Sequence, residues 1–481
     1  MATAVLSFLA WFHRWVGIIL CVMFAAWFAS GAVMVFVPFP ALPEADRAAH
    51  SELLDVSRLR LDPAEAKRLL RSASSLRLVS VGGTPAYVGR GPDGRDSALS
   101  GETGTPIALV TAVQAAEIAS RFGSAATADI EGPIDYDQWV INDRFDPLRP
   151  FYRVRLGDKA GTDLYVSVRS GEVAQRTTRF ERGWNWVGAV VHWVYFVPLR
   201  KNFQAWDWGM WFVGLIAVMT TAAGVSLGLI RTIKTLRSRR PALSPFRGFL
   251  RWHHILGLTA GIFVLCWIVS GWFTNDDGKL FSDGAASSAQ MRAYEGAADG
   301  ATGATIAIAD LNRLTPASSI EFRSIAGRAV AAALGSGPAR VAVAGWTGAA
   351  VRPRLPGGLL REAVQLAWPM ADVSPVAAVS LDTVVAKAEH LQEQTVQLDL
   401  HGSADRRVYI DAVNGDITAV LNRSREVYDW VCYAIHTFNY PGLSSRPILR
   451  VAILLVPLGL GFCFSLTGVV VGYRRLRTTL A

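Results

Sequence analysis

Cysteine and histidine are both scarce in this sequence. Its 481 residues include four cysteines and eight histidines. The cysteines stand apart, without CxxC or CxxCH spacing, so the sequence supports neither a cysteine-based zinc site nor a prosthetic group attached covalently through cysteine. Buried free thiols are therefore expected at all four positions, which are Cys21, Cys266, Cys432 and Cys463.

Charge is scarce as well. Asp, Glu, Lys and Arg make up 18% of the chain and hydrophobic residues 51%, which is too apolar for a soluble enzyme of this size. The net charge of +9 could indicate a nucleic-acid partner, but the basic residues gather where apolar runs end, notably between Arg231 and Arg251. This pattern is typical of cytoplasmic loops in membrane proteins, so no nucleic-acid partner is expected. No charged segment precedes the first apolar run, which disfavours a cleaved signal peptide.

Four apolar stretches are long enough to cross about 30 Å of hydrocarbon, which takes roughly 20 helical residues. They lie at residues 1–38, 207–231, 249–274 and 450–473. Basic residues in the loop 232–248 and the tail 474–481 place both termini in the cytoplasm. The connecting segments 39–183 and 275–425 would then be periplasmic domains of a multi-pass protein in a bacterial inner (cytoplasmic) membrane. Their mixed charge and short alternating runs predict α+β folds.

The second half of the chain repeats the first. An offset of 240 residues aligns the first span with the third, and an offset of 244 aligns the later parts of the two halves. Residues of several types coincide at these offsets: His13 with His253, Ser30 and Gly31 with Ser270 and Gly271, His192 with His436, and Gly224 with Gly468. We therefore predict a tandem parallel repeat around a pseudo-twofold axis along the membrane normal, in which the small residues permit close helix packing.

Four histidines occupy these repeat pairs. His13 and His253 each open a span near the cytoplasmic face, with a glycine one turn later on the same helix face. His192 and His436 each follow a tryptophan by six residues. The surrounding stretches predict short interfacial helices that end before a proline, at residues 184–200 and 426–440.

The repeat axis would bring the two members of each pair together, one pair at each membrane face. This arrangement suits two b-type haems with two histidine ligands each, because imidazole is a normal axial ligand and non-covalent haem needs no cysteine motif. Haem iron is the only metal expected. Alternatively, the histidines only face the interface or bond a neighbouring helix. His254 matches Arg14, so it is an alternative ligand or a neighbour of the site. Three further histidines are expected to be ordinary surface residues: His50, His390 and His401.

The motifs of the chain resemble those of the PepSY-associated transmembrane family. The first helix of each half reads LAWFHRWVGIIL and LRWHHILGLTAG, the second outer histidine lies in AIHTFNYPGL, and the last helix contains LTGVVVGYRR. A PepSY-like strand and turn occurs as YRVRLGDKAGTDLYVSVRSGEV and again as RRVYIDAVNGDITAV, with Gly171 and Gly415 in the turns. The resemblance covers nearly the whole chain.

The resemblance implies a membrane reductase with haem b, because the family includes iron-regulated inner-membrane proteins and ferric-siderophore reductases. Electrons would pass outward to a periplasmic ferric siderophore or other ferric chelate and release Fe(II). The haem-ligand role carries over to His13, His253, His192 and His436, although HWVYFVPLR around His192 departs from the motif. The sequence shows no GxGxxG after a strand, so a quinol or a cytoplasmic reductase is expected as the electron donor.

Outer-sphere electron transfer demands no catalytic acid or base from the protein. The acceptor would dock on the outer domains or on an aromatic rim that includes Trp139, Trp184 and Trp193. A different function is also open, in which the chain is a haem-free scaffold or sensor that binds periplasmic peptides or protein partners. A transporter is disfavoured, since the spans contain almost no carboxylate or lysine away from their ends.

Overall fold

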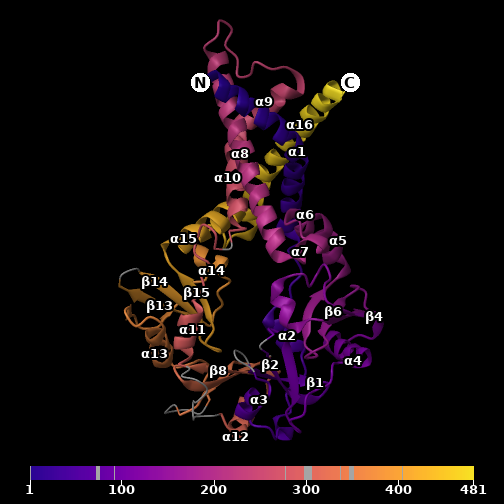
Figure 1. Ribbon diagram of the computed structural model, residues 1–481, viewed down its shortest axis with the longest axis vertical. Coiled ribbons are helices and arrows are strands. Elements are labelled where there is room, and N and C mark those ends of the chain that lie inside the picture. Colours follow the sequence, from indigo (N-terminus) through magenta and orange to yellow (C-terminus); the bar gives the residue numbers. More distant parts are fainter. Residues whose placement is uncertain are drawn as a thin grey trace.

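The computed structural model describes residues 2–71, 76–91, 93–276, 278–296, 306–335, 337–345, 351–402 and 405–480. Long helices form one end of the molecule, and three β-sheets with short helices form the other (Figure 1). Both chain termini lie at the helical end, and so does the basic loop 237–247. The β-sheets all lie at the opposite end of the bundle.

Three long helices are apolar enough to cross a membrane. They are α1 (Ala2–Phe36), α8 (Phe203–Leu236) and α16 (Pro447–Leu480). Helix α1 packs against both of the others, and Leu20, Phe28 and Ala217 belong to an apolar core between the helices. The apolar faces that remain exposed, such as that around Ile19 and Val22, are the faces a bilayer would cover.

A fourth candidate span consists of two short helices, α9 (Gly248–Thr259) and α10 (Gly261–Phe273), which meet at an angle of 67°. The sequence predicted one continuous helix over 249–274, and this was wrong. The bend falls at Ala260, where two nearby glycines lower the helix propensity and let the backbone turn. The described part of the chain therefore contains three to four candidate spans.

Two of the three sheets each pack against one helix. A four-stranded antiparallel sheet in the order β4-β5-β6-β7 packs against α4 (Ala112–Gly123). A five-stranded sheet packs against α13 (Gly357–Ala367). Its order is β11-β13-β14-β15, and β12 also pairs with β13. The strands of the first are Thr127–Ile134, Phe151–Leu156, Asp163–Ser167 and Val173–Thr177. Those of the second are β11 Asp372–Val373, β12 Ala377–Ala378, β13 Thr395–His401, β14 Arg406–Asp411 and β15 Ile417–Leu421.

The predicted strand-turn-strand segments lie in these two sheets. Gly171 joins β6 to β7 with a φ of 69°, and Gly415 joins β14 to β15 with a φ of 78°. A side chain is strained in this left-handed region, which explains a glycine in both turns.

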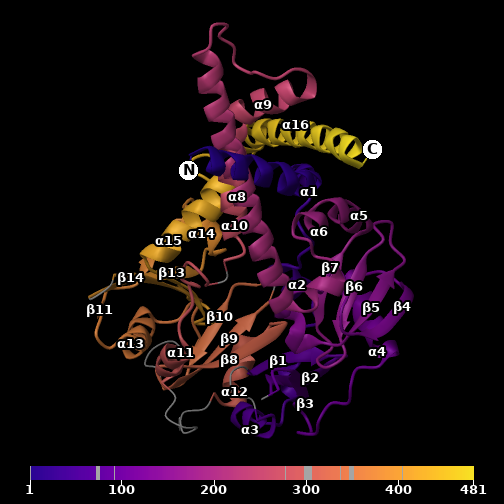
Figure 2. The same ribbon diagram turned by 45° about the horizontal axis from the view of Figure 1, so that its top comes forward.

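A six-stranded antiparallel sheet connects the two halves of the chain (Figure 2). Its order is β10-β9-β8-β1-β2-β3, so β1 from the first half pairs with β8 from the second. The strands are β1 Leu76–Val81, β2 Thr84–Arg90, β3 Asp96–Ser100, β8 Ser319–Ile325, β9 Arg328–Leu334 and β10 Arg340–Val343. Leu78 lies opposite Ile320, and both are fully buried in one core. The segments predicted as two domains thus share this sheet, and only the four-stranded and five-stranded sheets are separate.

The shorter helices connect these units. They are α2 (Glu44–His50), α3 (Pro63–Leu69), α5 (Arg179–Val187), α6 (Ala189–His192), α7 (Val197–Arg200), α11 (Ser288–Glu295), α12 (Ile308–Leu311), α14 (Val384–Ala388) and α15 (Arg423–Asp429). Single 3₁₀ turns occur at η1 (Val56–Arg58), η2 (Asp143–Leu148) and η3 (Asn312–Leu314), and η4 (Trp430–Ile435) is a π-helix.

The first predicted interfacial helix is broken, whereas the second is continuous. In place of one helix over 184–200 there are α5, α6 and α7, because the backbone leaves helical geometry at Gly188 and Val194. Pro198 stands in the first turn of α7 instead of ending a helix, a position that suits its fixed φ. The helix predicted over 426–440 starts a few residues earlier, as α15, and continues through the π-helix η4 to residue 437.

The four cysteines are free, but only Cys21 and Cys432 are buried. Cys266 and Cys463 are exposed, contrary to the expectation that all four would be buried. They lie on the outer faces of α10 and α16, which other helices do not cover.

Candidate paired-histidine site

One pair of histidines lies near the end of the bundle that carries the termini. His13 of α1 and His253 of α9 face each other with their ring centres 6.4 Å apart and their planes inclined by 36°. Both line a mostly apolar cavity of about 430 Å³ between the helices, which we call the inner cavity. Its wall includes Gly17 and Gly257, the glycines one turn after each histidine.

The other pair lies where the helices meet the β-sheets. His192, the last residue of α6, and His436, which follows η4, also have ring centres 6.4 Å apart, with planes inclined by 58°. They line a second cavity of about 570 Å³, the outer cavity, together with Trp27 and Trp267. Both cavities fall within the size range of small-molecule and cofactor sites.

The shared separation of 6.4 Å matches two imidazoles on opposite sides of one metal ion. Two metal–nitrogen bonds of about 2.0–2.1 Å, with roughly 1.1 Å from each nitrogen to its ring centre, add to about 6.3 Å. Each cavity holds one such pair, and the inner cavity is also lined by His254. In the described part of the chain, no three His, Cys, Asp or Glu side chains gather to hold an ion. Two protein ligands suit a metal whose remaining ligands come from a macrocycle.

The Nδ1 atom of each histidine already has a hydrogen-bond partner. His13 Nδ1 lies 2.9 Å from the carbonyl oxygen of Thr220, and His253 Nδ1 lies 3.1 Å from the hydroxyl of Thr467. Among the described residues, neither Nε2 atom has a hydrogen-bond partner. A ligating histidine usually donates its other ring N–H in this way, which fixes the tautomer and leaves Nε2 free to bind a metal.

The outer histidines are held by two matching serines. His192 Nδ1 lies 3.1 Å from Ser30 Oγ, and His436 Nδ1 lies 3.0 Å from Ser270 Oγ. Each serine donates its own proton to the carbonyl oxygen three residues earlier, so its oxygen accepts from the imidazole. The sequence had singled out these serines only for helix packing. Their match in the repeat was the available signal, but it did not show the histidine contact.

Each histidine also packs on a glycine of another helix. A β-carbon at Gly31 would come within 3.4 Å of His192 Cε1, and one at Gly271 would come within 3.1 Å of His436 Cε1. At Gly468 the distance to His253 Cε1 would be 3.5 Å, and at Gly224 a β-carbon would overlap the ring of His13. All four glycines belong to the pairs that the repeat offsets align.

The outer histidines are uncharged at neutral pH. Burial lowers the pKa of His192 to about 4, and burial together with the nearby His192 lowers the pKa of His436 to about 4. A neutral imidazole keeps the lone pair that a metal ligand needs.

His254 lines the inner cavity but faces a different helix. Its Nε2 atom lies 3.2 Å from the carbonyl oxygen of Gly228 and 3.4 Å from the hydroxyl of Thr232. Its ring meets Phe246 edge to face. With Nε2 turned toward α8, His254 is placed as a neighbour of the His13 and His253 pair.

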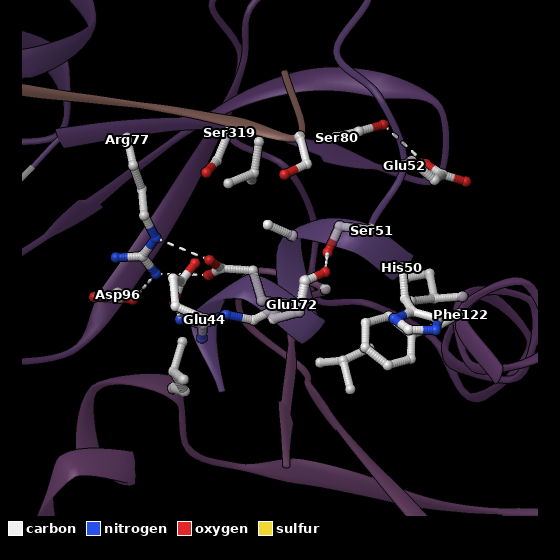
Figure 3. A pocket seen from close by; sticks show the side chains of 18 of the residues that line it. Glu44, His50, Ser51, Glu52, Arg77, Ser80, Asp96, Phe122, Glu172 and Ser319 are labelled. Carbon is white, nitrogen blue, oxygen red and sulfur yellow. Dashed lines mark hydrogen bonds and ion pairs between the residues drawn. The ribbon is translucent and has the colours of Figure 1, made fainter. Parts of the chain in front are cut away.

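The remaining histidines are exposed, as expected. His390 contacts the hydroxyl of Tyr433, and His401 lies near Asp405. His50 packs on Phe122 at the edge of a polar cavity of about 240 Å³ among the sheets (Figure 3).

The centre of this polar cavity is an ion-pair cluster. Arg77 lies 2.5 Å from Asp96 and 2.6 Å from Glu172, and Figure 3 shows the Arg77 side chain pointing at the Glu172 carboxylate. The charges of these side chains are therefore paired with one another inside the protein.

The predicted aromatic rim is only partly exposed. Trp184 is half exposed and Trp193 lines the outer cavity, but Trp139 is buried, with 3% of its surface accessible. Trp139 packs against Phe39 and Phe151 in the core beneath α6, so it was wrongly included in a docking surface.

The helices and sheets define a membrane protein with extramembrane β-sheet domains. Residues 10–349 match the PepSY-associated TM region, and the chain belongs to this family. The match includes His13, His192 and His253, while His436 lies beyond it. No curated protein matches the sequence.

Proposed function

We propose that this protein is a di-haem electron-transfer protein of the bacterial inner membrane. His13 and His253 would hold one b-type haem in the inner cavity, and His192 and His436 would hold another in the outer cavity. The observation that carries the proposal is the 6.4 Å separation of both histidine pairs, in which every histidine lines a cavity and has its Nδ1 atom engaged.

The residues present fit this cofactor. The glycines beneath the histidine rings make room for the imidazoles that would hold it, where larger side chains would displace them. Arg231 and Arg475 line the inner cavity at its charged end and would pair with the carboxylates of the macrocycle. Arg450 lines the outer cavity and could do the same there.

We also infer that the chain is a tandem parallel repeat with four spans, α9 and α10 together forming the third. The matching contacts support this: Ser30 with His192 repeats as Ser270 with His436, and Gly224 with His13 repeats as Gly468 with His253. Eighteen residues separate His13 from Gly31 on α1, which is about 27 Å of helix. This length is close to the hydrocarbon thickness, so the two pairs would lie near opposite membrane faces.

Aromatic side chains connect the two cavities. Phe24 lines the inner cavity and Trp27 the outer one, and their ring centres are 6.0 Å apart. Phe28 packs on Trp267 at 5.7 Å beside them. These packed rings join the wall of one cavity to that of the other.

A bound haem supplies one-electron chemistry at a potential set by its ligands and surroundings. The chain would hold the imidazoles, keep them neutral and exclude water. In the orientation that the basic loops favour, the β-sheet domains are periplasmic and the outer cavity opens toward them. The acceptor would be a ferric siderophore or other ferric chelate, reduced at the rim formed by Tyr428, Tyr433 and Asn439. A quinol or a cytoplasmic reductase would donate electrons at the inner site.

An absorption spectrum of the purified protein, before and after dithionite, tests the proposal. We expect a reduced low-spin b-type band and about two haems per chain. Protein made with ample haem that shows no such band would overturn the proposal and favour the haem-free scaffold or sensor. Reduction of a ferric chelate by the dithionite-reduced protein then tests the acceptor.

A further inference from the structure

A buried carboxylate lies close to the outer histidine pair. Asp429 is the last residue of α15, and the π-helix η4 connects it to His436. Its side chain is completely inaccessible, and neither oxygen has a hydrogen-bond partner among the described residues. A buried carboxylate without a hydrogen bond is costly, so the protonated form is favoured. Segments of π-helix are also frequent at functional sites.

A second carboxyl group, that of Glu389, lies against the same arginine as Asp429. Arg425 Nε lies 2.6 Å from Glu389 Oε1 and 3.6 Å from Asp429 Oδ1, so one guanidinium serves two carboxyl groups. Only 10% of the Glu389 side chain is accessible. Two carboxylates with one cation leave an excess negative charge, which a proton bound between them removes.

Further charged groups surround this pair on several elements. They are Glu426 on α15, His390 after α14 and Asp276 after α10. Burial, and next to it the charge of Glu389, raise the pKa of Asp429 well above that of an ordinary carboxyl. Arg425 opposes this shift but does not cancel it.

The other half of the chain lacks the titratable group. Asn185 stands seven residues before His192, as Asp429 stands seven residues before His436. It is also fully buried, and its amide donates to the carbonyl oxygens of Pro38 and Glu181. An amide cannot bind a proton at physiological pH, so only the His436 side of the outer site carries this carboxyl pair.

We propose that Asp429 and Glu389 form a proton-accepting pair that binds one proton when one electron reaches the outer histidine site. The proposal rests on the proposed function above. The electron would convert Fe(III) to Fe(II) and add one negative charge. A proton from external water would bind to the carboxylate pair, and both would leave when the electron passes to the ferric acceptor. Electron and proton therefore balance in each cycle.

The separation is short enough for this coupling. Seven residues of helix correspond to about 10 Å. A unit charge at that distance shifts a pKa by about one unit at an effective dielectric constant near 20. A tenfold change in the proton affinity of Asp429 is sufficient, because the raised pKa of this carboxyl brings its titration toward working pH.

Potentiometric titration of the haem-loaded protein at several pH values tests the coupling. We expect the outer haem potential to fall as pH rises, by at most about 59 mV per unit, the value for one proton per electron. Asp429→Asn and Glu389→Gln should each flatten this slope. Asp405→Asn, which removes an exposed carboxylate outside this cluster, should leave it intact. Equal slopes in wild type and Asp429→Asn would overturn the proposal.

Redox-difference infrared spectra give an independent readout. Reduction should increase a protonated-carboxyl band that shifts in D₂O and disappears in Asp429→Asn. A haem-loaded protein with pH-independent potentials would refute the coupling alone. Protein without haem would refute the proposed function, and the coupling with it.

Discussion

His436 and Ser270 form a hydrogen bond of 3.0 Å between the imidazole Nδ1 and the hydroxyl Oγ. Because Ser270 donates its own proton to the carbonyl oxygen of Trp267, its oxygen must accept from the imidazole. The proton of His436 therefore resides on Nδ1, and Nε2 presents its lone pair to the outer cavity. The contacts of the histidines, the buried carboxyl of Asp429 and the sheet shared by β1 and β8 can each be tested by substitution.

Replacing the serine should weaken the outer site without removing its ligand. We expect Ser270→Ala to lower haem affinity at the outer site by about 10- to 100-fold, the usual effect of losing such a partner. Haem titration of the apoprotein measures this. Ser465→Ala is the control, since this buried serine bonds only the carbonyl oxygen of Gly461. Unchanged affinity in Ser270→Ala would show that the hydrogen bond does not support the ligand.

Removing one histidine should empty one site. His13→Ala or His253→Ala should remove about half of the reduced b-type absorbance, and His192→Ala or His436→Ala the other half, because each pair would bind one haem. His401→Ala, at an exposed position, is the control. Loss of all haem from one substitution would indicate a single site.

The glycine beneath His13 gives a steric test. Gly224→Ala should displace the His13 ring and reduce haem at the inner site only, because the new β-carbon would overlap the imidazole. Gly209→Ala on the same helix is the matched control, since a β-carbon there meets nothing within 4 Å. Alanine raises helix propensity by about 1 kcal/mol at either position, so a loss cannot come from a weaker helix. Full loading of Gly224→Ala would contradict the predicted position of the haem.

The carboxyl pair predicts a pH-dependent stability. The pKa of Asp429 is raised in the folded protein, whereas in the unfolded chain it is about 3.9. Its stabilising contribution is thus full below the unfolded pKa and is lost as pH rises through the folded pKa. Between about pH 4 and 8, the Tm of Asp429→Asn should fall less than that of wild type. Asp405→Asn, an exposed carboxyl, should behave as wild type in the same thermal scans. Parallel Tm curves for all three proteins would argue against a raised pKa.

The sheet that connects the halves gives a test of stability. Leu78→Ala should cost about 2–5 kcal/mol, since this fully buried side chain packs in the core shared by β1 and β8. Hydrogen exchange should increase in both strands together. Leu109→Ala, at a position 61% exposed, should change stability by about 0.5 kcal/mol or less. Faster exchange in β1 alone would mean that the strands do not unfold as one unit.

The membrane helices and the histidine positions were predictable from the sequence because both leave local signals. Long apolar runs predict spans wherever they occur. When residues of several different types recur at one offset, they mark corresponding positions in the two halves. The structure places His13 beside His253 and His192 beside His436. The haem that they would bind stays a prediction.

Other features depend on contacts that a sequence does not encode locally. The alternation in β1 predicts a strand but does not specify β8 as its partner. The bend at Ala260 depends on how α9 and α10 pack on different neighbours, α16 and α8. Ser30 and Ser270 were visible as repeat positions, yet only the fold shows that they hold histidines.

The pairing of β1 with β8 also imposes an order on biosynthesis. The ribosome completes β1 at residue 81, but the partner strand begins only at residue 319. In between, the ribosome makes α8, a candidate membrane span, and the bent α9–α10 pair. Until then β1 has an unpaired backbone edge, a site where other extended chains can add. A nascent chain of this protein would therefore need either rapid synthesis or a protective chaperone on the outer side of the membrane.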